Sequence, residues 1–155
     1  PAAAPPSGKS VPPMIATYRY GDPRTDDALR IGVARQPPRG VRREDFPLYF
    51  DLWLRILAPS TELLRAYRAR RIDFPAFERR YRAEMAQHEP RQVIDLVATL
   101  SQHRAIRVGC FCDDESRCHR SVLKTLLTAA AANLPTSQPR RRYASPACFA
   151  NEDEF

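Results

Sequence analysis

The chain has 155 residues, 25 of them Lys or Arg, and its formal net charge is +7 at pH 7. A chain of this length is most simply one domain with a buried core, and the absence of a long apolar run excludes a membrane-spanning helix. The four cysteines are irregularly spaced and there is no charged-then-apolar leader, so we expect a soluble, cytoplasmic protein with reduced thiols.

The positive charge comes almost entirely from arginine. A guanidinium binds phosphate through two parallel hydrogen bonds, so this composition favours a nucleotide or nucleic acid as partner and gives no sign of a membrane partner. An Arg- and Ala-rich chain also arises from a GC-rich genome without selection for binding. Net charge alone therefore indicates non-specific association rather than a mechanism.

The two ends differ in composition from the middle of the chain. Residues 1–13 are mostly Pro, Ala, Ser and Gly, which predicts a disordered N-terminal extension because such a segment cannot bury apolar surface. After Ala132 the chain turns to Pro, Ser and Arg with an acidic end, so residues 133–155, including Cys148, are predicted to form a flexible C-terminal tail. The folded domain is expected at residues 14–132.

Two short strands are predicted near the start of this domain. Residues 15–20 alternate apolar and polar side chains and are closed by the turn signal Gly21-Asp22-Pro23. Residues 29–34 predict a second strand, which ends at the Pro- and Gly-rich residues 36–40. We expect the two strands to be neighbours in one sheet.

An amphipathic, aromatic-rich segment follows between residues 42 and 57. The apolar residues that recur at helical spacing are Phe46, Tyr49, Phe50, Trp53, Leu54 and Leu57. Their spacing predicts one helix whose apolar stripe packs on the sheet. Trp53 is expected in the core rather than as a binding platform.

Three further helices are predicted before the last strand. Ser60 can cap a helix over residues 61–70, and Asp73 can cap a second, with Pro75 in its first turn, where a helix accepts proline. Pro90 opens the third. The apolar positions of the third helix are Val93, Leu96, Val97 and Leu100.

Arginines crowd the first two of these helices, and a solvated face is the simpler interpretation of such a run. They are Arg65, Arg68, Arg70, Arg71, Arg79, Arg80 and Arg82.

The residue types that carry chemistry gather between residues 106 and 127. Residues 106–112 predict a buried strand, and Ser116 is the expected N-cap of the next helix, so Cys118 and His119 fall in its first turn. Ligands bind outside the carboxyl ends of strands in an open α/β sheet. We therefore predict an α/β fold, a small open sheet of at least three strands flanked by helices, with a functional cleft at this turn.

Several segments resemble one known family. They are Ile15-Ala-Thr-Tyr-Arg19 with Asp22-Pro23, Arg35 with Pro38-Arg39-Gly40, Asp51-Leu-Trp-Leu54, Ala58-Pro-Ser-Thr-Glu-Leu63 and Phe77-Glu-Arg-Arg-Tyr81-Arg-Ala-Glu84. Over residues 14–127 the chain is similar to the domain-of-unknown-function 488 family, and within it to the YeaO-like proteins. That family has no settled biochemical function, so the resemblance implies a fold and no substrate.

The strand-to-helix turn resembles a different branch of the same family. In that branch a strand-end Cys is followed by a Cys-His-Arg triplet that opens the helix, and here these residues are Cys110 and Cys118-His119-Arg120. An acidic residue often stands two places after the first Cys in that branch, where this chain has Cys112.

A metal site is one interpretation of the turn, because three cysteines and a histidine are a legitimate zinc set. On one strand face Cys110 and Cys112 would lie about 6.7 Å apart along the chain. Thiolates on tetrahedral zinc need sulfurs roughly 3.8 Å apart. This spacing argues against a metal site, and we expect no cofactor. Without a metal, Cys110 is expected to be a buried structural cysteine.

The favoured interpretation is a pocket for the phosphate of a nucleotide or nucleic acid at the helix N-terminus, where backbone N–H groups attract anions. Its expected ligand-binding residues are Arg35, Arg39, Cys110 and Arg120. His119 should face the sheet and, when buried, needs a hydrogen-bond partner. The acidic residues Asp113, Asp114 and Glu115 would repel a phosphate unless they cap the helix and face solvent.

Thiol catalysis is the alternative, with Cys118 and His119 as the catalytic residues at the helix end. Adjacent helical residues point about a quarter-turn apart, and nearby carboxylates raise a thiol pKa, so both points count against this pair. An enzyme that acts on a phosphate-bearing ligand through a reactive thiol is therefore the second hypothesis.

Overall fold

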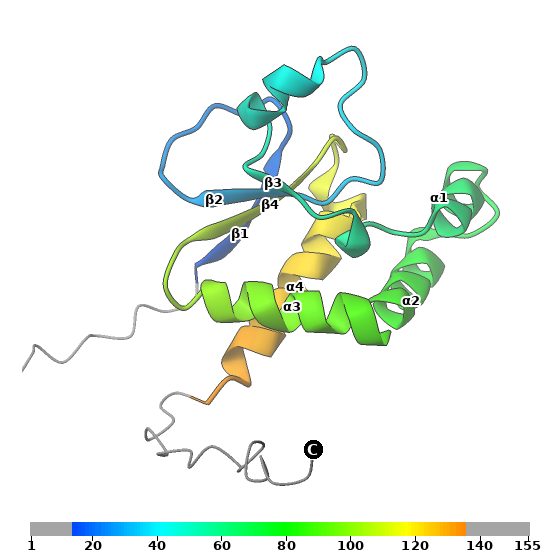
Figure 1. Cartoon of the computed structure of the whole chain (residues 1–155). Helices are drawn as coiled ribbons and strands as arrows, with labels where there is room; N and C mark the ends of the chain where they lie inside the picture. The colour runs from blue at the N-terminus through cyan, green and yellow to red at the C-terminus, as the bar shows by residue number, and fades with distance from the viewer. Residues whose placement is uncertain (1–13, 136–155) are drawn as a thin grey trace, which may run out of the picture.

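The computed structural model describes residues 14–135, so the predicted extension at residues 1–13 and the tail beyond residue 135 lie outside the described residues. Four strands form one parallel sheet in the order β1-β4-β2-β3 (Figure 1). Their bounds are Ile15–Arg19 for β1, Leu29–Gly32 for β2, Leu52–Trp53 for β3 and Ile106–Cys110 for β4. The predicted α/β fold with an open sheet of at least three strands is confirmed.

Strand β4 lies between β1 and β2, with Ile106 paired to both Ile15 and Leu29. The expectation that the first two strands are direct neighbours is therefore wrong. β4 and β2 are the two inner strands of the sheet, and their residues Ile106, Val108 and Ile31 have no exposed surface, as is typical of parallel strands covered on both faces. Since all four strands are parallel, their carboxyl ends lie along one side of the sheet, the carboxyl edge.

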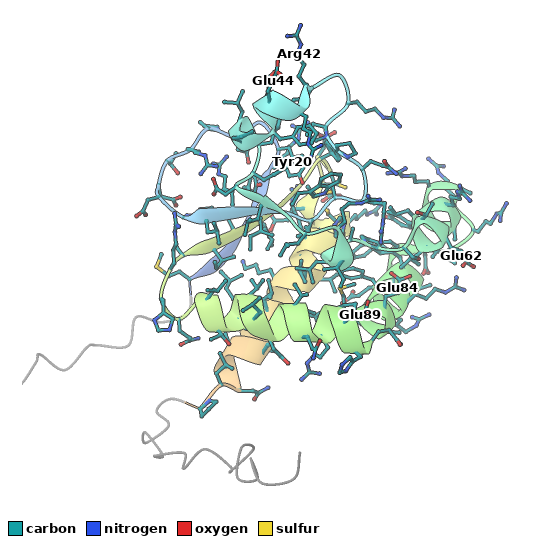
Figure 2. The ribbon with its side chains drawn as sticks, in the orientation of Figure 1. Tyr20, Arg42, Glu44, Glu62, Glu84 and Glu89 are labelled. Carbon is teal, nitrogen blue, oxygen red and sulfur yellow. The ribbon has the colours of Figure 1, made fainter. Side chains whose placement is uncertain are left out.

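Four α-helices accompany the sheet in the described residues. They are α1 (Thr61–Arg68), α2 (Phe74–Met85), α3 (His88–Leu100) and α4 (His119–Ala132). Ser60 and Asp73 cap α1 and α2 as predicted, and Pro75 lies in the first turn of α2. The backbone N–H of Ser60 also donates to Glu84 of α2 at 2.8 Å, which ties α1 to α2 (Glu84 is labelled in Figure 2). None of these helices is long and apolar enough to cross a membrane.

Helix α3 buries a different face from the predicted one. Ile94, Val97 and Ala98 are buried, whereas Leu96 and Leu100 are 58% and 40% exposed. Both stripes have helical spacing, and the buried one is selected by packing against α4 and residues 55–57 rather than by local sequence.

The predicted helix over residues 42–57 is wrong. This segment contains the 3₁₀ helix η1 (Arg43–Leu48), the strand β3 and the 3₁₀ helix η2 (Arg55–Leu57). Pro47 lies inside η1, where it lacks an N–H and blocks a continuous α-helix. The following residues pair with β2 instead: Asp51 N donates to Arg30 O at 2.8 Å.

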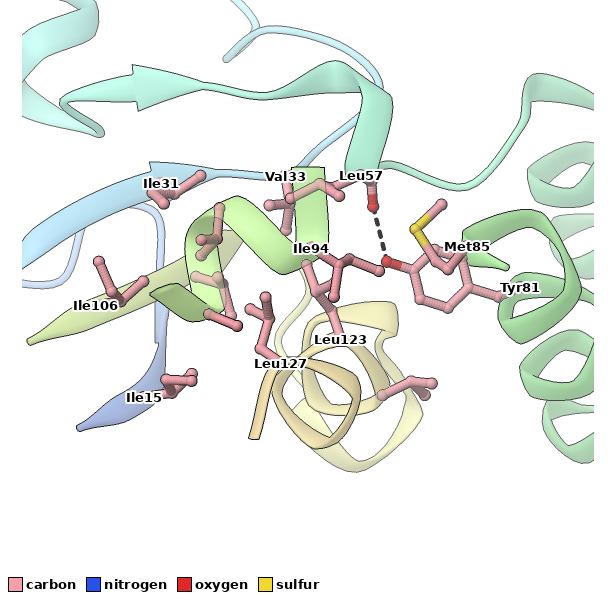
Figure 3. Packing of buried hydrophobic residues seen from close by; sticks show 14 of the residues in the cluster. Ile15, Ile31, Val33, Leu57, Tyr81, Met85, Ile94, Ile106, Leu123 and Leu127 are labelled. Carbon is pink, nitrogen blue, oxygen red and sulfur yellow. Dashed lines mark hydrogen bonds between the residues drawn. The ribbon is translucent and has the colours of Figure 1, made fainter. Parts of the chain in front are cut away.

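The main core lies between one face of the sheet and the helices α3 and α4, with α2 at its end (Figure 3). Its side chains without exposed surface include Ile31, Val33, Leu57, Ile106, Val108, Leu123 and Leu127. Tyr81 of α2 reaches into this core, and its hydroxyl donates to Leu57 O at 2.7 Å.

An aromatic cluster covers the opposite face of the sheet. The rings of Tyr18 and Tyr20 lie over Gly109 and Gly32, where an added Cβ would come within 2.2 Å of the Tyr18 ring and 2.4 Å of the Tyr20 hydroxyl. Trp53 packs against this cluster, and its Nε1 donates to a backbone carbonyl at 2.8 Å. Trp53 is thus a packing residue, as predicted, although it belongs to the second cluster rather than the main core.

Candidate functional site

The chain leaves β4 at the carboxyl edge and turns into α4. β4 ends at Cys110, a short 3₁₀ helix, η3 (Glu115–Arg117), follows, and Cys118 is the N-cap of α4. The prediction that Ser116 caps this helix is wrong, because Asp114 accepts the backbone N–H of Ser116 at 2.9 Å and closes a separate turn first. Cys118 therefore stands just outside the helix, in extended backbone.

The turn brings three sulfur atoms together. The Sγ atoms of Cys110 and Cys112 lie 3.7 Å apart, and those of Cys110, Cys112 and Cys118 all lie within 4.8 Å of one another. Cys110 and Cys118 are buried, whereas Cys112 is exposed. The predicted separation of the first two cysteines is wrong because the strand ends at Cys110, which lets Cys112 turn back toward it.

His119 is buried, and its Nε2 lies 2.8 Å from the carbonyl oxygen of Val33, just beyond β2. A carbonyl only accepts hydrogen bonds, so this contact assigns the ring proton to Nε2 and leaves Nδ1 as an acceptor. Burial lowers the pKa of His119, which keeps the ring neutral. The predictions that His119 is buried and has a partner are confirmed.

His119 and Cys118 meet despite being adjacent. The His119 Nδ1 lies 3.8 Å from Cys118 Sγ. The expectation that the two side chains diverge assumed helical backbone at both positions. Cys118 is instead extended, with φ −122° and ψ 142°, which turns its side chain toward the ring.

Arg120 is almost completely buried, with 4% of its surface exposed. Its Nη1 donates to Cys110 O at 3.3 Å and to Cys112 O at 2.9 Å. Its Nε is a buried donor without a hydrogen-bond partner in the described residues. Arg120 therefore braces the backbone that carries two of the sulfurs, and its role in binding an anion stays a prediction.

The other two arginines of the predicted pocket are not gathered at the sulfurs. Arg35 donates from Nε to Pro59 O at 2.9 Å and from its guanidinium to Ala58 O at 3.1 Å, so it anchors the segment before α1. Arg39 is exposed in the turn that follows β2 and makes no side-chain hydrogen bond or ion pair within residues 14–135.

The acidic residues of the turn face solvent and fasten the turn to β1. Asp113 pairs with Arg19 at 2.5 Å, and Glu115 accepts the hydroxyl of Thr17 at 2.5 Å. Asp114 caps η3. These contacts give the carboxylates a structural role in holding the turn against the sheet.

The three thiols shift one another's pKa in opposite directions, lowering that of Cys112 and raising those of Cys110 and Cys118. Hydrogen bonds from the Cys110 and Cys118 thiols lower the pKa of Cys112, and the Arg120 guanidinium lowers it further. The hydrogen bond to Cys112 raises the pKa of Cys110 to about 11. Hydrogen bonds to the other two thiols, together with burial, also raise the pKa of Cys118. The most acidic thiol is the exposed one.

Cys112 is considered in the metal interpretation of the sequence but is not among the predicted catalytic or ligand-binding residues. It was placed on a regular strand, far from Cys110. The signal that could have found it is the Cys-x-Cys spacing at a strand end, because a strand that stops at its first Cys brings the second one back beside it.

The open parallel sheet defines a small α/β domain, and thiols and an imidazole gather at the carboxyl end of its inner strand β4 as a candidate site. The chain belongs to the DUF488 family: residues 15–131 match the family model described as "Active DUF488-N3 subclade". The resemblance seen in the sequence is confirmed.

A curated relative is the "Uncharacterized protein YeaO" of Escherichia coli (strain K12), which is 41% identical over 76 residues. The match covers 48% of this chain and 64% of that protein, so it spans less than two thirds of the relative's length. No solved structure matches the chain.

Proposed function

We propose that Cys110, Cys112 and Cys118 bind a zinc ion at the carboxyl edge. The spacing of their sulfurs carries this proposal. Thiolates at about 2.3 Å from a tetrahedral zinc lie roughly 3.8 Å from one another. The Cys110–Cys112 separation is 3.7 Å and all three sulfurs lie within 4.8 Å, so small side-chain rotations suffice to reach that geometry.

His119 is the candidate for the fourth ligand, although it lies outside the group of atoms that are all within 4.8 Å of one another, so its ring must move toward the other two sulfurs. Its Nδ1 is an acceptor 3.8 Å from Cys118 Sγ, while Nε2 donates to the carbonyl of Val33. Zinc-ligating histidines usually donate their other ring N–H to a carbonyl or carboxylate, which fixes the tautomer and the ring. With His119 bound the zinc site is closed and structural; with water in that position it is of the catalytic kind.

Arg120 supports the same site electrostatically. Three thiolates around one zinc ion carry a net charge of −1, which is costly in a largely buried place without a nearby cation. The Arg120 side chain is buried, and its guanidinium lies beside Cys110 and Cys112, since it donates hydrogen bonds to the backbone carbonyls of both residues. The guanidinium would compensate the negative charge of the zinc–thiolate group and fix the distance between Cys110 and Cys112.

Binding of a phosphate-bearing ligand, such as a nucleotide, is the second candidate function at this edge. It is favoured by the buried Arg120 Nε without a partner in the described residues and by the N-terminus of α4, where the side chain of the cap residue accepts no backbone N–H of the helix. Arg120 and Arg35 already serve backbone carbonyls, which leaves few cations for a phosphate. An enzyme could also use the Cys112 thiolate as a nucleophile on such a ligand. This function requires that no metal is bound to the Cys112 sulfur.

Metal analysis of the full chain separates these functions. Protein purified without chelator should hold about one equivalent of zinc, because a site with three thiolates retains its metal. Single Cys→Ser changes at positions 110, 112 and 118 should each reduce it strongly, whereas Cys148→Ser is the matched control and should not. Zinc below about a tenth of an equivalent, with rapid alkylation of Cys112 by iodoacetamide, would instead support the thiol enzyme.

A further inference from the structure

The α1–α2 hairpin (residues 61–85) carries arginines that the fold leaves exposed. They are Arg65 and Arg68 on α1, Arg70 and Arg71 in the turn, and Arg79 and Arg80 on α2. Within residues 14–135 none of these six lies within 4.0 Å of a carboxylate, although Glu62 stands one turn before Arg65. Arg82 differs, because it pairs with Glu78 at 2.8 Å. The six guanidinium groups are thus available to a partner.

The turn of the hairpin holds Arg70 in the left-handed region, with φ 55°. The backbone N–H of Arg71 donates to Ala66 O and that of Arg70 to Tyr67 O, both at 3.0 Å, which is the Schellman arrangement at a helix end. The position of Arg70 is the one where helices usually have glycine, because a Cβ is strained there. Arginine at this position destabilises the turn relative to glycine and adds a positive charge at its tip. The conformation of the turn therefore does not explain why residue 70 is arginine.

The hairpin lies at the side of the molecule, and many of its side chains extend away from the sheet (Figures 1 and 2). We propose that this hairpin binds the phosphate backbone of a nucleic acid. Every cation of the hairpin is arginine and none is lysine. The planar guanidinium fork matches two phosphate oxygens, and backbone contacts of this kind need no base pocket. The inference is independent of the zinc proposal.

The test measures binding of the full chain to a fluorescein-labelled DNA duplex of about 20 base pairs, by fluorescence anisotropy from about 50 to 200 mM salt. The combined variant Arg65→Gln, Arg68→Gln and Arg79→Gln removes three cations from the hairpin. The control variant Arg42→Gln, Arg91→Gln and Lys124→Gln removes the same charge from other elements.

The wild-type chain should bind with an affinity that falls steeply with salt. Each hairpin arginine removed should lower the slope of log K against log salt by about 1, so the combined variant should bind about 100-fold or more weakly at 0.1 M salt. The control variant should keep most of the affinity. Equal losses in the two variants would overturn the proposal, and so would tighter binding to phosphatidylserine vesicles than to the duplex.

Arg70→Gly distinguishes a binding role from a folding role. Glycine relieves the left-handed strain, so the melting temperature should rise by a few degrees. The same change removes one phosphate contact, so duplex affinity should fall by about eightfold at 0.1 M salt, the factor that a slope of about 0.9 per contact implies. A more stable variant with unchanged affinity would contradict the assignment of Arg70 to the binding surface.

Discussion

Arg120 is a buried cation whose hydrogen bonds go to the backbone of the site. Its Nη1 joins Cys110 O and Cys112 O, so it fixes the path of the chain between two sulfurs. Charged donors to carbonyls are stronger than neutral ones, and removing Arg120 takes this donor from both carbonyls, although Cys110 O keeps the backbone N–H of Tyr20 at 3.0 Å. The residue therefore links the folding of the turn to the spacing of the thiols.

Arg120→Ala should lower the free energy of unfolding by about 2–4 kcal/mol, because two carbonyls lose a charged donor and a buried side chain is removed. Urea denaturation measures this change. Arg117→Ala, at an exposed position on η3, is the control and should stay within about 0.5 kcal/mol of the wild type. A loss below about 1 kcal/mol for Arg120→Ala would show that the brace is dispensable.

The location of the candidate site could be predicted from the sequence, whereas the hydrogen-bond partners of several of its residues could not. Cys110, Cys118 and His119 do come together, since a parallel strand and the helix after it predict one edge. The partners of Arg35 and Arg120 could not be predicted, because backbone carbonyls from distant segments or from a turn of unknown shape take up their guanidinium groups.

At the scale of elements, local signals predicted the caps of α1 and α2 correctly but failed at Ser116, and non-local strand pairing could not be predicted. Ser60 and Asp73 cap the helices that they were expected to cap, because a cap depends on residues within one turn. The segment over residues 42–57 has helical spacing, yet it joins the edge of the sheet as β3. The formation of β3 depends on hydrogen bonds to β2, a strand that lies earlier in the chain, so the apolar spacing within residues 42–57 cannot predict it.

Asp51 holds β3 against β2 and should make stability depend on pH. Its carboxylate accepts the backbone N–H of Arg30 at 2.8 Å and pairs with Arg24 at 2.7 Å. Burial raises the pKa of Asp51, but the bonds from Arg24 and Arg30 outweigh it and lower the pKa below its usual value. A carboxylate with a depressed folded-state pKa stabilises the fold above its unfolded-state pKa and loses that effect as pH falls through the folded value.

Asp51→Asn should therefore reduce the free energy of unfolding at pH 7, by about 1 kcal/mol for this partly exposed pair. The difference from the wild type should shrink below about pH 4, where the native carboxyl itself becomes protonated. Urea denaturation at both pH values measures it, with Asp45→Asn as an exposed control on η1. A difference that stays constant down to pH 3 would refute this role of the carboxylate.

At the scale of the whole molecule, the sheet order decides which distant residues meet. β4 enters last in the chain but takes the centre, between β1 and β2. His119 can then bond to Val33, and the turn after β4 can be fastened to Thr17 and Arg19 of β1. Strand type and rough position were predictable from apolar runs, whereas strand order was not, because it depends on hydrogen bonds between strands that are distant in the sequence.

Zinc removal should weaken the fold as a whole, because the proposed ligands join the central strand β4 to α4, which packs on the main core. A metal that binds only the folded state adds to its stability. Chelator treatment should lower the melting temperature by more than about 5 °C. Added zinc should restore it, whereas magnesium, which prefers oxygen ligands, should not. An unchanged melting temperature would indicate that no bound metal supports the fold.

The most direct test of the thiolate site is X-ray absorption spectroscopy at the zinc edge on protein purified without chelator. The predicted spectrum contains three sulfur neighbours at about 2.3 Å and one lighter neighbour at about 2.0–2.1 Å, which is nitrogen if His119 binds. In His119→Ala the three sulfurs should remain and the lighter neighbour should become oxygen from water. A first shell of oxygen and nitrogen alone, or protein without zinc, would contradict the account.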